Sequence, residues 1–118
     1  MTDQTSKLDS LPARDADAAL ASAGGDADLA RELLDVLLAG LPEEIEELRA
    51  CIAEADWIAL AEHAHQVRGA TRYCGVPALD EAIEALERTA RRGDTALVSD
   101  DFAAVESQAS RLVEALGA

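Results

Sequence analysis

The sequence predicts an all-α fold: an antiparallel up-and-down four-helix bundle with a short additional N-terminal helix. Hydrophobic residues make up 49% of the 118-residue chain, and many of them are Ala and Leu, both strong helix formers. Aromatic residues amount to only 3%, so a sheet-rich fold has little support. Apolar residues also recur every three or four positions, which is typical of helices with one buried face.

The chain begins with a stretch that has no hydrophobic periodicity. We therefore expect residues 1–13 to be a flexible lead-in and residues 14–118 to form a single domain. The short helix is expected from Asp15 to Ala23. Gly24-Gly25 would end it, because glycine readily adopts the left-handed conformation that follows a helix.

The longest amphipathic segment comes next. Asp26 or Asp28 is suited to cap it, because a short acidic side chain accepts hydrogen bonds from the free N–H groups of a first turn. Pro42 interrupts the pattern, so the segment is either one kinked helix or two helices joined there. Its expected buried face consists of Leu29, Leu33, Leu37, Leu41, Ile45, Leu48 and Ile52.

Three more helical segments complete the expected bundle. They run from Trp57 to about Cys74, from Val76-Pro77 to Gly93, and from near Ser99 to Leu116. Asp56 would cap the first, and Gly75 would stop it. The last is expected to bury Phe102, Val105, Ala109, Leu112, Val113 and Leu116. The connections between the long segments are short, which favours antiparallel neighbours.

The charge balance and hydropathy argue against several classes of function. With 24 acidic against 10 basic residues, the formal net charge is −14, and such a field repels nucleic acid and anionic lipid. No apolar run approaches the roughly 18 residues of a membrane span, and the polar N-terminus does not read as a signal peptide. Cys51 and Cys74 fall in helical patterns and are expected to be buried, reduced thiols.

One segment carries an exposed histidine with basic neighbours. On its helix, His65 lies about 130° from the centre of the apolar stripe, so it should face solvent or a shallow groove. Arg68 and Gly69 follow at three and four residues, the spacings that make side chains neighbours on a helix surface. Arg72 lies in line with it two turns on, and Glu62 lies one turn before. This acidic chain therefore places two arginines and a glycine beside one exposed histidine.

Phosphoryl transfer suits this arrangement. A neutral imidazole is a competent nucleophile near pH 7, so His65 is the candidate phosphoacceptor. Arg68 and Arg72 could support the phosphoryl group, whose oxygens carry negative charge during transfer. Gly69 would leave the surface open to a partner, and glycine within a helix costs about 1 kcal/mol relative to alanine. Glu62 could accept the N–H of the other ring nitrogen.

His63 is not expected to assist His65. Residues two positions apart diverge by about 200° around a helix, so the two imidazoles point to different sides. We expect an ordinary interhelical or surface contact for His63.

The segment around His65 resembles a known family signature. The run Ala64-His65-Gln66-Val67-Arg68-Gly69-Ala70 is similar to the signature of histidine phosphotransfer (HPt) domains, in which His is followed by a hydrophobic residue, Lys or Arg, Gly and small residues. Val67 stands where leucine is common. The similarity covers most of the chain from about residue 11, and residues 69–77 resemble C-terminal HPt domains of hybrid sensor kinases of the GacS/BarA type.

The resemblance implies a phosphorelay carrier and not an enzyme. It implies that His65 accepts a phosphoryl group from a receiver-domain phospho-aspartate and passes it to another receiver aspartate, with Arg68 supporting the group. Glu87 occupies a position that is often polar in the family, and we expect it to hydrogen-bond toward Arg68. The expected docking surface consists of Ala61, Glu62, Arg68, Gly69 and Arg72.

The implied partners are response-regulator receiver domains and a hybrid sensor histidine kinase. We expect no cofactor and no metal site in this chain, because Mg²⁺ would be held by the acidic residues of the receiver. The expected state is a monomer in the cytoplasm, or the cytoplasmic part of a membrane-anchored kinase, with no direct membrane contact.

Three other functions fit parts of the pattern. Glu62-x-x-His65 matches one element of di-iron helical bundles, but such sites need a second element and the chain has only 2 histidines. A kinase dimerisation domain also carries a bundle histidine, but it usually has an acidic residue where this chain has Gln66, and it needs an ATP-binding domain. A helical protein-interaction module without phosphotransfer is the alternative that stays open.

Overall fold

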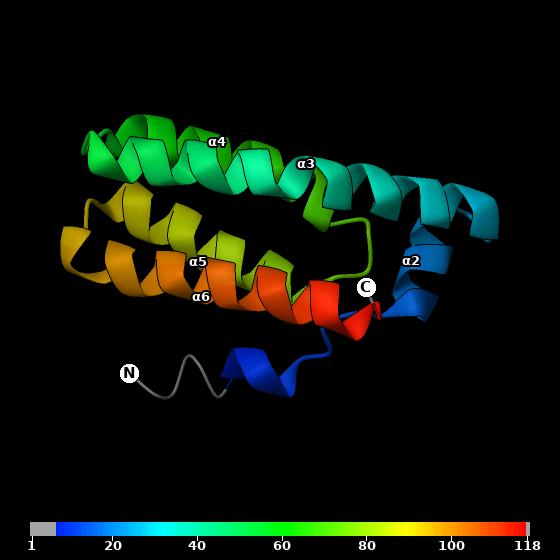
Figure 1. Ribbon diagram of the computed structural model, residues 1–118. Coiled ribbons are helices and arrows are strands. Elements are labelled where there is room, and N and C mark those ends of the chain that lie inside the picture. The colour runs from blue at the N-terminus through cyan, green and yellow to red at the C-terminus, as the bar shows by residue number, and fades with distance from the viewer. Residues whose placement is uncertain (1–6, 118) are drawn as a thin grey trace.

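The computed structural model describes residues 7–117, and the regular structure within that range is helical, without strands. After a helical turn at residues 7–10, the helices are α2 (Ala16–Ser22), α3 (Ala27–Ala53), α4 (Trp57–Thr71), α5 (Pro77–Arg92) and α6 (Thr95–Ala115). Helices α3 to α6 run side by side, and the short α2 is set across their direction where α3 begins (Figure 1). The predicted all-α four-helix bundle with a short extra helix is confirmed.

Acidic caps set the start of three helices. The Asp15 carboxylate accepts from the backbone N–H of Ala18 at 3.0 Å, and Asp26 and Asp56 cap α3 and α4 through the same contact at 3.1 Å. Each cap satisfies one of the N–H groups that a first turn leaves without a partner. The choice between Asp26 and Asp28 is therefore settled in favour of Asp26.

Pro42 lies inside one continuous helix. Helix α3 spans 27 residues from Ala27 to Ala53 with the proline in its interior. Of the two possibilities that the sequence left open, a single helix is the correct one. The proline lacks an N–H and so removes one internal hydrogen bond, but both halves of α3 pack against the rest of the molecule.

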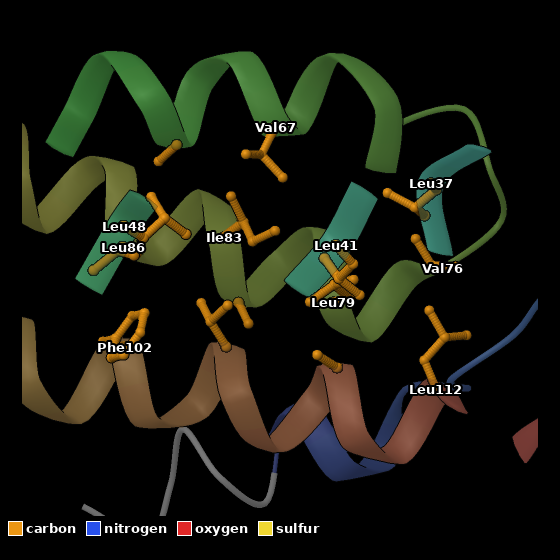
Figure 2. Packing of buried hydrophobic residues seen from close by; sticks show 14 of the residues in the cluster. Leu37, Leu41, Leu48, Val67, Val76, Leu79, Ile83, Leu86, Phe102 and Leu112 are labelled. Atoms are coloured by element: carbon orange, nitrogen blue, oxygen red, sulfur yellow. The ribbon is translucent and has the colours of Figure 1, made fainter. Parts of the chain in front are cut away.

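The core lies between the four long helices, with α5 at its centre. Figure 2 shows Leu79, Ile83 and Leu86 of α5 between Val67 of α4 and Phe102 of α6. Side chains of α3 close the cluster from another side. The contributions of α3 are Leu34, Leu37, Leu41 and Leu48. Helix α5 therefore packs on both α4 and α6, and side chains at its edge can contact α4.

Some bounds and exposures of the helices differ from the expectation. Helix α6 begins at Thr95, one turn before Ser99, and its Val113 is exposed. Leu29 and Leu33 were expected to be buried and are exposed, because the first turns of α3 extend past the end of α4 (Figure 1). The buried stripe of α3 is shifted by one position there, to Ala30 and Leu34.

The segment before α2 also differs from the expectation. Residues 7–10 are helical and Leu8 is only 1% exposed. The Arg111 guanidinium of α6 donates to the carbonyl oxygens of Leu8, Asp9 and Leu11 at 3.2, 3.2 and 2.6 Å. Residues 7–13 thus pack on the bundle, whereas a flexible lead-in was expected through residue 13. Residues 1–6 of that expected lead-in lie outside the described range.

The two cysteines are not bridged. Cys51 is half-buried and Cys74 is buried, and both are free thiols. Burial raises the pKa of each thiol above its ordinary value, so both are protonated at neutral pH. The expected burial is confirmed for Cys74, whereas Cys51 is less buried than expected.

Candidate functional site

His65 projects from the middle of α4. The neighbouring Ala64 and Val67 face the core, and the imidazole lies outside it, with 61% of its side chain exposed. The predicted exposure of His65 is confirmed. It lies on the side of α4 that packs against α5, so residues of α5 complete its surroundings.

The carboxylate of Glu87 on α5 contacts the imidazole. Nδ1 of His65 lies 3.2 Å from Oε2 of Glu87, whose side chain is only 12% exposed. An ionised carboxylate can only accept hydrogen bonds, so Nδ1 carries the proton in this contact. Nε2 then keeps its lone pair and points away from Glu87.

The partner of the imidazole differs from the one that the sequence suggested. Glu62 was expected to accept the ring N–H, but Glu62 is exposed and Glu87 makes that contact. Glu87 was in turn expected to bond toward Arg68, and it bonds to His65 and Arg91. The helix spacing placed Glu62 near His65 correctly, but the packing of α5 brings a second carboxylate closer.

Arg91 shares the carboxylate oxygen that contacts His65. Its Nε and Nη2 lie 3.0 and 2.9 Å from Oε2 of Glu87. Arg91 is one turn after Glu87 on α5, the spacing at which an acid and a base pair along a helix. Glu87 thus contacts both His65 and Arg91 and lies between them.

Arg68 is engaged by a different carboxylate. Its Nε and Nη2 lie 3.3 and 3.4 Å from the two oxygens of Asp80, and Thr71 donates to the same group at 2.7 Å. Glu84 lies 3.9 Å from Nη1 of Arg68. Burial disfavours the charged guanidinium, but the hydrogen bond and charge of Asp80 outweigh it and raise the pKa of Arg68.

The guanidinium of Arg68 is therefore not held toward His65. Only 16% of its side chain is exposed, and its hydrogen bonds tie α4 to α5. The sequence placed Arg68 beside His65 correctly but could not show this partner. Arg72, the second expected phosphoryl-supporting residue, is exposed at the end of α4.

The expected docking residues differ in accessibility. Gly69 is exposed, and a Cβ built on it would meet nothing within 4 Å, so the surface one turn after His65 is open as expected. Glu62 is exposed as well. Ala61 is only 3% exposed and faces the core, so its expected place in a docking surface is corrected.

His63 contacts α3. Its Nε2 lies 2.7 Å from Oε1 of Glu44, although the pair does not have hydrogen-bond geometry. The expected interhelical contact of His63 is confirmed, and the two imidazoles do lie on different sides of α4. Among residues 7–117, no three His, Cys, Asp or Glu side chains gather in a group that could hold a metal ion.

Three contributors to this surface were missed in the sequence. Asp80, Glu84 and Arg91 lie on the edge of α5 that meets α4. A signal for them existed, because Asp80, Glu84, Glu87 and Arg91 recur at spacings of three or four and mark one polar edge of a helix. What this spacing does not reveal is which helix that edge faces.

Comparisons with known proteins agree with this geometry. Residues 32–116 match the Hpt domain family. The chain is 43% identical over 84 residues to the sensor histidine kinase GacS of Pseudomonas protegens, a match that covers 71% of this chain and 9% of that protein. It is 33% identical over 75 residues to the signal transduction histidine-protein kinase BarA of Shigella flexneri, covering 64% of this chain and 8% of that protein. The chain thus matches less than a tenth of the length of these relatives.

A solved structure shares the fold. The crystal structure of the HPT domain from the Hpt sensor hybrid histidine kinase of Shewanella aligns with a TM-score of 0.64 and 26% sequence identity. The alignment covers 90% of this chain and 97% of that domain. Family match, sequence relatives and fold agree. The chain belongs to the Hpt domain family.

Proposed function

We propose that this protein is a phosphorelay carrier in two-component signalling. His65 accepts a phosphoryl group from the phospho-aspartate of a response-regulator receiver domain and passes it to the aspartate of another receiver. The observation that carries this proposal is an exposed imidazole whose Nδ1 is bonded to Glu87 at 3.2 Å, which leaves Nε2 available as the nucleophile.

Transfer at this atom balances without a further reactant. The lone pair of Nε2 attacks phosphorus, the N–P bond forms as the P–O bond to the receiver aspartate breaks, and the aspartate leaves as a carboxylate with the electron pair. The Nδ1 proton stays in place, and the positive charge that develops on the ring faces the Glu87 carboxylate. Transfer to the next receiver is the reverse of these steps. The protein is thus a carrier and not an enzyme.

The surroundings of His65 fit a docked receiver. Gly69 leaves open space one turn away, and Glu62 lies exposed on the other side of the imidazole. Arg72 is exposed two turns on and could reach the oxygens of a phosphoryl group. Mg²⁺ would be held by the receiver, and this chain would need no cofactor of its own.

The proposed setting is the cytoplasmic side of a hybrid sensor kinase pathway, with the chain acting as a monomer. Support for this setting comes from the kinase relatives and from the net charge of −14, which disfavours nucleic acid and anionic lipid as partners. Within the described residues, no helix is long and apolar enough to cross a membrane.

The test is phosphotransfer from a labelled, phosphorylated receiver domain to this chain. Wild type is compared with His65→Gln and with the matched control His63→Gln, which alters the other histidine of the same helix. We expect label that is acid-labile and alkali-stable, attached at Nε2, and lost only in His65→Gln. Failure of the wild type to take label from any of several receivers would favour the interaction module, and label that survives His65→Gln would refute the assigned site.

A further inference from the structure

We propose that Arg91 is a positioning residue for phosphoryl transfer at His65, acting by holding the Glu87 carboxylate against Nδ1 of the imidazole. This inference rests on the proposed function and deepens it. It assigns a role to a side chain on a different helix from the histidine and outside the sequence signature around it.

The first argument is that one oxygen serves both partners. Oε2 of Glu87 lies 3.2 Å from Nδ1 of His65 and 3.0 and 2.9 Å from Nε and Nη2 of Arg91. Nε donates a hydrogen bond to this oxygen and Nη2 lies at ion-pair distance from it, so the guanidinium restrains Oε2 by a hydrogen bond and by its charge. Where Oε2 is held, the acceptor for the imidazole N–H is held too.

The second argument is the burial of Glu87. Its side chain is 12% exposed while that of Arg91 is 53% exposed. The oxygens of a carboxylate so far removed from water need hydrogen-bond or ion-pair partners within the protein. In residues 7–117, Arg91 is the arginine or lysine that forms an ion pair with Glu87. A carboxylate oxygen held at Nδ1 favours the tautomer in which Nδ1 is the donor and Nε2 is the free nitrogen.

The third argument is that Arg68 is engaged elsewhere. Its Nε and Nη2 donate to Asp80 at 3.3 and 3.4 Å, and its Nη1 lies 3.9 Å from Glu84. The two arginines therefore pair with different carboxylates. The Arg68 contact joins the helices, and the Arg91 contact fixes the acceptor that orients the imidazole.

The chemical consequence concerns the tautomer of His65. The hydrogen bond that one ring nitrogen makes determines which nitrogen is left free. A Glu87 side chain released from Arg91 can rotate away, so that Nε2 carries the proton in a larger share of molecules. Those molecules cannot attack phosphorus through Nε2, and the rate of transfer falls in proportion.

The test combines a rate with a spectroscopic readout. The variants are Arg91→Gln, the conservative Arg91→Lys, and the control Arg92→Gln, which removes an exposed arginine from the adjacent position of the same last turn. Transfer from a phosphorylated receiver is timed, and nitrogen NMR of the unphosphorylated chain reports the tautomer of His65. We expect Arg91→Gln to slow transfer on the order of tenfold, by analogy with the loss of a partner that orients a metal-binding histidine, and to lower the share of the Nδ1–H form. Arg91→Lys should restore most of both, and Arg92→Gln should behave as wild type.

Two results would overturn the inference. Unchanged rate and tautomer in Arg91→Gln would show that Glu87 holds its place alone. A slower rate with an unchanged tautomer would show that Arg91 acts on the phosphoryl group or the receiver directly. The NMR measurement needs no phosphate, so it still tests the contact if the wild type takes no label, which is the result that counts against the proposed function itself.

Discussion

Two glycines near the site serve different purposes. Gly75, between α4 and α5, has a φ of +67°, and a Cβ on it would clash with the carbonyl oxygen of Asp15. Gly69 is helical, and a Cβ on it would meet nothing within 4 Å. Gly75 is therefore required by packing and backbone conformation, while the fold leaves room for a side chain at Gly69.

Gly75→Ala should destabilise the protein strongly. Left-handed backbone costs a residue with a Cβ about 1–2 kcal/mol, and the contact with Asp15 adds to that, so we expect a loss of about 3 kcal/mol or more in the free energy of unfolding. Urea denaturation measures it. Gly93→Ala is the matched control, because Gly93 has a φ of +69° and open space around it. Equal losses in both variants would contradict the role assigned to the close approach.

Gly69→Gln should slow phosphotransfer and leave the fold intact. The longer side chain fills the open surface that a receiver needs, whereas glutamine in a helix is favoured over glycine by roughly 0.5–1 kcal/mol. Transfer rates and urea denaturation are measured together. Gly40→Gln is the control, a change at a glycine of α3 that also has open space. Transfer as fast as in the wild type would refute the argument that Gly69 provides access.

At the scale of the elements, the edge between α4 and α5 organises the site. Arg68 and Thr71 of α4 both bond to Asp80 of α5, and His65 of α4 bonds to Glu87 of the same helix. The first contact is partly buried and ties α4 to α5. The second uses that fixed geometry to hold the imidazole.

Arg68→Gln should therefore mainly lower the stability of the protein, and Arg72→Gln should mainly slow phosphotransfer. Loss of the Arg68 hydrogen bonds to Asp80 should lower the free energy of unfolding by about 1–2 kcal/mol. Arg72 is exposed, so its loss should change stability by less than about 0.5 kcal/mol while transfer slows. Urea denaturation and receiver phosphotransfer give the two values. A larger stability loss in Arg72→Gln than in Arg68→Gln would contradict this division.

At the scale of the whole molecule, the bundle includes residues that precede its first long helix. Leu8 is buried among core residues, and Gln108 of α6 donates to Asp9 at 2.9 Å. Together with the Arg111 contacts to backbone carbonyls, they join the segment before α2 to the last helix. The site lies on the α4–α5 side, so these contacts stabilise the bundle without contacting His65.

Leu8→Ala should lower the free energy of unfolding by about 2–4 kcal/mol, the usual cost of truncating a buried leucine. The measurement is urea denaturation, with Val36→Ala as a control because that side chain is 73% exposed. Transfer to His65 in the folded variant should equal that of the wild type. If both alanine variants were equally stable, the segment before α2 would not belong to the folded unit.

Much of the fold was predictable from local pattern. Asp15, Asp26 and Asp56 begin helices where a capping residue precedes apolar periodicity, and Gly93 ends one in the left-handed conformation. The wrong expectations concern residues whose burial depends on which other helices cover them, and the local pattern does not show this. Leu29 and Leu33 continue the apolar face of α3 beyond the point where other helices cover it, and Leu8 is a single leucine with no pattern around it.

The sequence alone determined that the chain is a helical bundle, that His65 is exposed on α4, and that Arg68, Gly69 and Arg72 follow it on the same helix. These properties depend on spacing within one helix, which the backbone geometry dictates. Only the tertiary structure decided that Glu87 contacts the imidazole, that Arg68 bonds to Asp80, and that Arg91 bonds to the carboxylate that contacts His65. Those contacts cross from α4 to α5 or depend on that crossing, and the rotation and register of one helix against another are set by packing of the whole core.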